Sequence, residues 1–282
     1  METEPKRSFE IPNGKLILIG GAENKSPVKK RSDTNKKVLA AFVELCGKSP
    51  SIEVITTASN EDVDETYRVY KACFEELGAK NVGHIHHDNR PPAEADLNER
   101  ITKANGVFFS GGDQLKLTAV YGGTELLSLM KERYVYKGLV VGGTSAGAMA
   151  MSTPMIFDGS GTDEIVAAGV KVTTGFEFLR DVCVDTHFVH RGRFVRMAQV
   201  IATNPSSSGI GIEEDTAIVI TAGIKARVIG SGVVIILDGA TSHGTNITSF
   251  DDDKKITIRD LKVSILSMGE EFTIPCRNLP HL

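Results

Sequence analysis

The chain of 282 residues has no tryptophan, few other aromatic residues and no excess of positive charge. Aromatic residues make up 6% of the sequence, so stacking platforms for bases or sugars are scarce. Lysine and arginine number 32 and aspartate and glutamate 36, which gives a formal net charge of −4. Proteins that bind nucleic acid by neutralising phosphates usually carry the opposite sign, so we expect no nucleic-acid partner.

The sequence also has only four cysteines and few long apolar runs. The cysteines Cys46, Cys73, Cys183 and Cys276 lie far apart and form no CxxC pair, which is typical of buried free thiols in a reducing compartment. No apolar run precedes Leu16, and none approaches the roughly 20 residues of a membrane helix. We therefore expect a cytoplasmic protein without a signal peptide and without a membrane partner.

The first two thirds of the sequence alternate between apolar strands and amphipathic helices. Repeated β-α units of this length predict a parallel sheet with helices on both faces. We expect strands at 15–19, 51–56, 82–85, 106–109 and 137–141, and helices at 35–46, 61–77, 95–103 and 121–133.

After Met151 the pattern changes to short strands with no helix between them, at 209–212, 216–220, 226–229 and 233–237. The last third is therefore expected to be antiparallel or mixed and to pack on the same sheet. This gives a single domain over 1–282, with an N-terminal extension over 1–14 and a mixed-strand portion over 209–282.

The strongest local signal for chemistry is the segment Gly143-Thr144-Ser145-Ala146-Gly147. An apolar strand precedes it and a helix of small residues follows, which matches the G-x-S-x-G nucleophile elbow. Such a turn holds the serine in a strained conformation with its hydroxyl exposed, and the helix N-terminus with the Ala146 N–H would favour an oxyanion. The alternative is a glycine turn that only packs helix on strand or cradles a phosphate.

A serine nucleophile needs a base, usually histidine, and the histidine needs an orienting group. Of seven histidines, His187 ends a strand-like run at the kind of edge where open α/β folds keep their sites. Glu213, Glu214 and Asp215 follow another apolar strand, and any of them could orient the base. Spacing alone does not choose among the three acids.

No metal or organic cofactor is expected. His84, His86 and His87 are close enough in sequence to form a metal site, but no carboxylate motif accompanies them. We therefore predict a polar loop there.

Charged and polar residues follow two of the predicted strands. Arg191, Arg193 and Arg196 come soon after Asp185, and arginines near a strand end suit the capture of carboxylates or phosphates, although a solvated basic face is the alternative. The run 110–114 (SGGDQ) is a second strand-to-glycine turn that could complete an oxyanion hole, with its Asp and Gln on the substrate; a simple helix cap is the alternative there.

Together these segments resemble the family of serine peptidases that contains the cyanophycinases and the α-aspartyl dipeptidases, peptidase family S51. The resemblance covers nearly the whole chain, and the arginine cluster and C-terminal extension favour the cyanophycinases over the shorter dipeptidases. It rests on 20–23 (GGAE), 110–114 (SGGDQ), 143–147 (GTSAG), 185–188 (DTHF) with the arginines after it, 209–217 (GIGIEEDTA) and 263–272, which looks like the family's closing strand.

The resemblance implies a three-layer αβα sandwich of the class I glutamine-amidotransferase-like (flavodoxin-like) type, with a C-terminal antiparallel extension, used as a homodimer. It implies that Ser145 is the nucleophile, His187 the general base and Glu214 the orienting acid, with Gly112 and Ala146 supplying the oxyanion N–H groups. The residues implied to line the substrate pocket are Asp113, Gln114, Asp185, Thr186, Arg191, Arg193 and Arg196.

The implied partner is cyanophycin, a poly-aspartate with an arginine joined by an isopeptide bond to each β-carboxyl. The family cuts the aspartyl backbone from the C-terminal end and releases β-Asp-Arg dipeptides. Asp113 and Asp185 would meet the substrate guanidinium and the arginines its carboxylates. The alternatives are an α-aspartyl dipeptidase or another small-peptide hydrolase with the same triad, and a catalytically silent binding protein on this fold.

Three positions depart from the family's pattern. Thr186 stands where the family has glutamine, Glu213 where it has aspartate, and Ala22 where it has a third glycine. None belongs to the expected triad. The difference at Thr186 bears on substrate preference rather than on hydrolysis.

Overall fold

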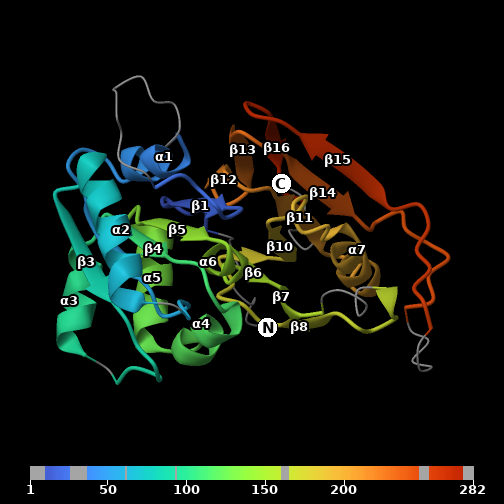
Figure 1. The fold of residues 1–282 in the computed structure, drawn as a ribbon, viewed down its shortest axis with the longest axis horizontal. Helices are drawn as coiled ribbons and strands as arrows, with labels where there is room; N and C mark the ends of the chain where they lie inside the picture. The colour runs from blue at the N-terminus through green and yellow to red at the C-terminus, as the bar shows by residue number, and fades with distance from the viewer. Residues whose placement is uncertain are drawn as a thin grey trace, which may run out of the picture.

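Two β-sheets, one of eight strands and one of six, form the centre of the molecule in the computed structural model (Figure 1). The structure describes residues 10–25, 37–60, 62–92, 94–159, 165–247 and 254–275. Most of the predicted N-terminal extension and Cys276 lie outside these ranges, whereas Cys46, Cys73 and Cys183 are buried free thiols as predicted. Within the described ranges, no helix combines the length and the apolar character needed to cross a membrane.

Five parallel strands make up the predicted half of the larger sheet, in the order β1-β5-β4-β2-β3. Most of their residues are buried, as expected where helices cover both faces. The strands are β1 (Lys15–Ile19), β2 (Ser51–Ile55), β3 (Asn81–Ile85), β4 (Gly106–Phe109) and β5 (Val140–Thr144).

Side chains alternate along each strand, so apolar residues of the strands point to both faces of this sheet, and helices cover both. Ile17 and Ile19 belong to one hydrophobic cluster and Leu16 and Leu18 to another. The first cluster includes α1 (Lys37–Leu45) and α2 (Val63–Glu76); the second includes α3 (Ala95–Lys103), α4 (Gln114–Tyr121), α5 (Glu125–Tyr136) and the short α6 (Ala146–Met149).

The helix predicted at 121–133 is wrong in its start, because the segment is broken by a glycine pair. Gly122 caps α4, Gly123 has a φ of 68°, and the Thr124 hydroxyl then accepts the Leu127 N–H at the start of α5. The strand predicted at 137–141 is shifted as well. β5 begins at Val140 and therefore ends directly before the serine of the predicted elbow.

The prediction that the strands of the last third pack on one sheet is wrong. They divide between two sheets. Three of them extend the larger sheet beyond β1 with antiparallel pairing, which is the expected C-terminal extension. These are β12 (Thr216–Thr221), β13 (Lys225–Gly230) and β16 (Glu271–Thr273). The predicted closing strand at 263–272 is two strands, because β15 (Lys262–Leu266) lies at the edge of the second sheet and β16 at the edge of the first.

The second sheet has the order β15-β14-β11-β10-β6-β9, and its central pair, β10 and β11, is parallel. Helix α7 (Phe194–Thr203) packs on β10, β11 and β14, and β7 (Met155–Asp158) pairs with β8 (Lys171–Thr173). The strands of this sheet are β6 (Ser152–Thr153), β9 (Leu179–Arg180), β10 (Val182–Thr186), β11 (Ser208–Ile212), β14 (Val234–Asp238) and β15 (Lys262–Leu266).

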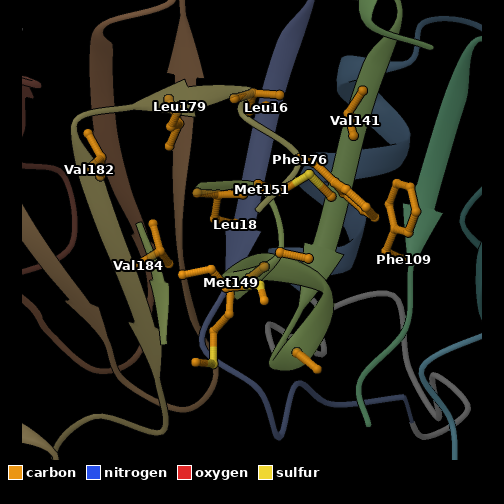
Figure 2. Close-up of a cluster of buried hydrophobic side chains, with 14 of the residues drawn as sticks. Leu16, Leu18, Phe109, Val141, Met149, Met151, Phe176, Leu179, Val182 and Val184 are labelled. Atoms are coloured by element: carbon orange, nitrogen blue, oxygen red, sulfur yellow. The ribbon is translucent and has the colours of Figure 1, made fainter. Parts of the chain in front are cut away.

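One hydrophobic cluster joins the two sheets. Figure 2 shows Met149 and Met151 in this cluster together with Leu16 and Leu18 of β1 and Val184 of β10; all five side chains are buried, and α6 contacts both β1 and β10. Burial of each such side chain stabilises the fold by about 1.5–3 kcal/mol. Helix α6 is therefore held between the sheets, and the residue before it lies where strands of both sheets end.

Candidate active site

The turn after β1 ties together the three segments that carry the predicted triad. One segment follows β5 of the larger sheet, and the other two follow β10 and β11 of the second sheet. Three successive carbonyls of the turn each accept one backbone N–H: Ile19 from Ser145 (3.0 Å), Gly20 from His187 (2.8 Å) and Gly21 from Asp215 (2.9 Å). The carboxyl ends of strands from two sheets are thus joined at one place, which is where α/β folds bind ligands.

The predicted elbow is present. Ser145 has φ 51° and ψ −118°, a conformation that L-residues rarely adopt and that is common at functional sites. A Cβ at Gly143 would lie 2.5 Å from the carbonyl of Gly147, and a Cβ at Gly147 would lie 2.3 Å from the Phe109 carbonyl oxygen. Both glycines are therefore required for the close approach of α6 to β5 and β4.

The three residues expected to form a triad lie in hydrogen-bonded sequence. Ser145 Oγ lies 3.0 Å from His187 Nε2, and His187 Nδ1 lies 2.6 Å from Glu214 Oε1. A proton on Nδ1 donated to the carboxylate leaves Nε2 free to accept the serine proton. A Cβ on Gly21 would lie 2.3 Å from His187 Cε1, so the imidazole packs directly on the backbone of the β1 turn.

Of the three consecutive acids, Glu214 is the one that contacts His187 in the described part of the chain, and the other two face elsewhere. The Glu213 carboxylate accepts the N–H groups of Val189 and His190, at 2.6 and 3.1 Å, and so holds the loop after the histidine. Asp215 has a left-handed φ of 47° and accepts the Ser231 hydroxyl at 2.7 Å.

Burial sets the charge state of this group. Burial lowers the pKa of His187 below its ordinary value; the hydrogen bond to Glu214 acts in the opposite direction, and the guanidinium of Arg191 lowers the pKa further. The hydrogen bond with His187 in turn lowers the pKa of Glu214. The imidazole is therefore neutral at pH values where a free histidine would be protonated, as a general base must be.

We expect the acid limb of the pH profile for Ser145 acylation to lie below pH 6.5, since only the neutral imidazole can accept the serine proton and the His187 pKa is lowered. The rate of labelling by a fluorophosphonate, followed between pH 4 and 8, measures this limb without a choice of substrate. Arg191→Ala removes a positive charge that lowers the pKa, so its limb should move to higher pH. A wild-type limb above pH 7 would contradict the assignment.

The predicted oxyanion donors lie beside the serine. Gly112 has a φ of 137°, and a Cβ there would lie 1.8 Å from the Ala58 carbonyl oxygen. A Cβ on Gly111 would lie 3.3 Å from Ser145 Cβ, so the turn after β4 packs against the serine. Among the described residues, the N–H groups of Gly112 and Ala146 have no acceptor, which leaves both free for a ligand.

Two of the predicted pocket residues, Asp185 and Arg196, contact each other and not the solvent. Asp185 Oδ2 and Oδ1 accept the Arg196 Nε and Nη2 at 2.6 and 2.5 Å, and Oδ1 also accepts Arg193 Nη1 at 3.0 Å. The side chains of Asp185 and Arg196 are 0% and 6% exposed. The expectation that Asp185 meets a substrate guanidinium is therefore wrong in this structure, because its carboxylate is already neutralised inside the protein.

The other predicted pocket residues have mixed positions. Thr186 is buried with no hydrogen-bond partner for its hydroxyl among the described residues, and so it does not face the solvent. Asp113 caps α4 by accepting the N–H groups that follow it, and Gln114 Nε2 donates to the Ile156 carbonyl at 2.9 Å. Arg191 is exposed and forms no ion pair within the described ranges, which leaves its guanidinium available.

One residue was not singled out from the sequence except as part of a motif. Glu23, after the β1 turn, is buried and accepts hydrogen bonds at 2.6 Å from the hydroxyls of Thr144 and Tyr70. A buried carboxylate needs such partners, but neither donor is near it in sequence. Only the fold could reveal this contact.

A cation could be held by one group of described residues, in which His190, Glu213 and Glu214 place ligand atoms within 4.8 Å of one another. Both carboxylates already accept hydrogen bonds from the protein.

Of the histidines predicted in a polar loop, His84 lies in β3, where its Nε2 is 2.7 Å from the Thr56 hydroxyl. Surface cavities of about 260 and 370 Å³, at the start of α5 and beside β3, contain none of the triad residues.

Comparison with known proteins places the chain in a family. The profile of "Peptidase family S51" matches residues 16–228. The cyanophycinase of Synechococcus elongatus is 30% identical over 269 residues, 95% of this chain and 81% of that protein. The cyanophycinase of Trichormus variabilis is 32% identical over 259 residues, 91% of this chain and 84% of that protein.

A solved structure has the same fold. The crystal structure of a peptidase from an acI-B1 Actinobacterium superposes with a TM-score of 0.68 at 23% identity, covering 94% of this chain and 98% of that one. This supports the predicted flavodoxin-like sandwich. The profile match and the identity to curated relatives together show that the chain belongs to peptidase family S51, as a hydrolase of the serine peptidase type.

Proposed function

We propose that the chain hydrolyses the poly-aspartate backbone of cyanophycin from its C-terminal end and releases β-Asp-Arg dipeptides. The observation that carries the chemistry is the 3.0 Å contact between Ser145 Oγ and His187 Nε2, with Glu214 2.6 Å from the other ring nitrogen. The substrate class is supported by the identity to cyanophycinases over more than nine tenths of the chain.

In this mechanism Ser145 Oγ attacks the carbonyl carbon of an aspartyl peptide bond while His187 Nε2 accepts its proton. The resulting oxyanion is stabilised by the N–H groups of Gly112 and Ala146, which lie free beside the serine. The C–N bond then breaks as His187 returns the proton to the leaving amine. Water, deprotonated by the same imidazole, hydrolyses the ester and regenerates the serine.

The exposed charge near the triad supports this substrate. Each arginine of the polymer keeps a free carboxylate and a guanidinium, so a site that binds it needs groups of both signs. Arg191 is exposed, lies close enough to lower the His187 pKa, and is our candidate for the substrate carboxylate. We assign Arg193 and Arg196 a supporting part, since both are engaged by Asp185.

Incubation with purified insoluble cyanophycin, followed by mass spectrometry of the soluble products, tests the proposal. We expect β-Asp-Arg to accumulate with the wild-type protein. An intact polymer together with hydrolysis of α-aspartyl dipeptides would contradict the proposed substrate and assign the chain to the dipeptidases of the family. An intact polymer, intact dipeptides and no labelling of Ser145 would contradict the peptidase mechanism itself.

A further inference from the structure

Glu23 is a buried carboxylate that the mechanism above does not use. Its side chain is 1% exposed, and a buried carboxylate is costly unless donors surround it. Three groups do so: the hydroxyls of Tyr70 and Thr144, each at 2.6 Å, and Lys25 Nζ at 3.0 Å. Lys25 Nζ also lies 5.0 Å from the centroid of the Tyr70 ring, so the cation is held on two sides.

The positions of these partners in the chain indicate which segments the Glu23 carboxylate holds together. Thr144 is the last residue of β5 and directly precedes Ser145. Glu23 follows the turn whose carbonyls bind the segments of the triad. The carboxylate therefore joins, through side chains, the same two segments that the Ile19 carbonyl joins through the backbone, and Tyr70 of α2 anchors it from outside the sheet.

The serine needs such support because its backbone is strained. At φ 51° and ψ −118°, Ser145 keeps its conformation only if its neighbours enforce it. On the N-terminal side, the Ser145 N–H bond to Ile19 and the Thr144 bond to Glu23 are the contacts that do so. A hydrogen bond to a carboxylate is among the stronger ones in proteins, and burial strengthens it further.

We propose that Glu23 is a positioning residue for the nucleophile: its carboxylate binds the Thr144 hydroxyl and thereby holds the Ser145 hydroxyl in reach of His187. The inference rests on the proposed role of Ser145 as nucleophile. Glu23 touches neither the serine hydroxyl nor the imidazole, and acts through Thr144. Its loss should therefore slow acylation and leave substrate binding nearly unchanged.

The test compares acylation of Ser145 by a fluorophosphonate in Glu23→Gln, Thr144→Val and the double variant, together with kcat and KM. We expect each single variant to lose roughly tenfold or more in acylation rate and kcat, with KM within about twofold, because small misplacements of a nucleophile have large effects on rate. The double variant should be no slower than the slower single variant, since both remove one contact. Thr144→Ser keeps the hydroxyl and should restore the rate.

Glu53 provides the matched control. It is also a buried carboxylate, paired with Arg100 at 2.5 Å, but it lies within β2 and away from the expected triad. Glu53→Gln should unfold at a lower denaturant concentration and label at the wild-type rate. A merely structural role for Glu23 would give the same result, with lower stability and an unchanged acylation rate per folded molecule.

The outcomes separate this inference from the proposed function. Normal acylation in folded Glu23→Gln, or additive losses in the double variant, would overturn the positioning role alone. If Glu23→Gln does not fold, the near-isosteric Thr144→Val decides, and a wild-type rate in that variant overturns the role. Failure of a fluorophosphonate to label wild-type Ser145 would refute the nucleophile and the inference with it.

Discussion

Replacement of Ser145 by alanine is expected to lower kcat by about 10⁴-fold or more, because removal of a triad member leaves only binding and oxyanion stabilisation. The change removes one oxygen, which lies 3.0 Å from His187 Nε2. Alanine keeps the Cβ and the backbone contact to Ile19, so neither the elbow nor the position of His187 should change. The polymer should still bind. Turnover of cyanophycin measures the loss of kcat, and sedimentation of the protein together with the insoluble polymer measures binding.

Ser128→Ala is a suitable control for this experiment. The Ser128 hydroxyl donates to the Thr124 carbonyl within the first turn of α5, and neither residue contacts the triad. The control should release β-Asp-Arg at the wild-type rate. Retention of more than about a hundredth of the activity in folded Ser145→Ala would be incompatible with a covalent serine mechanism, whose loss costs far more.

The elbow and the contact of His187 with its serine could be predicted because the signal for each is local in the sequence. Gly143 to Gly147 specify a strand, a tight turn and a helix within five residues, and the structure has Ser145 in the strained conformation that this pattern requires. His187 could be singled out because it ends an apolar run. Its φ of 50° lies in the left-handed region, like that of Ser145.

The acid that contacts His187 could not be predicted from spacing. Glu213, Glu214 and Asp215 are chemically similar neighbours, and their directions depend on the left-handed φ of Asp215 and on hydrogen bonds to distant residues. The family resemblance, and not the spacing, pointed to Glu214. The contacts of Glu23 were unpredictable for the same reason, since its partners Tyr70 and Thr144 are 47 and 121 residues away.

The division of the last third between two sheets could not be predicted from the sequence either. β11 and β12 are both short, apolar and largely buried, so their patterns do not reveal which sheet each joins. The choice is made by pairing over long distances, because β12 pairs with β1 whereas β11 pairs with β10 and β14. The ion pair of Asp185 with the arginines could not be predicted either. The sequence shows that these residues are charged, but not that they neutralise one another inside the protein.

We expect Asp185→Leu to lower the free energy of unfolding by about 3–5 kcal/mol, since breaking a buried ion pair leaves the remaining charge without compensation. The Arg196 side chain is 6% exposed and donates from Nε and Nη2 to Asp185, so its guanidinium cannot reach water freely without local unfolding. Equilibrium unfolding in urea measures the loss. The double variant Asp185→Leu/Arg196→Met replaces the Asp185–Arg196 pair by apolar groups of similar size and should recover much of the stability, while Arg193, whose side chain is 14% exposed, loses its carboxylate but keeps its bond to the Thr186 carbonyl.

The double variant also separates the two parts that Asp185 could play in the site. If the carboxylate served the substrate directly, a refolded apolar pair would still show a greatly raised KM. If it serves the protein, as its 0% exposure indicates, the recovery of stability should bring the recovery of most activity, with the remaining loss in kcat. A loss in kcat is expected because Arg193 Nη1 bridges Asp185 and the Thr186 carbonyl, at 3.0 and 2.8 Å, directly before His187. The ion pair thus helps to fix the end of β10 directly before His187.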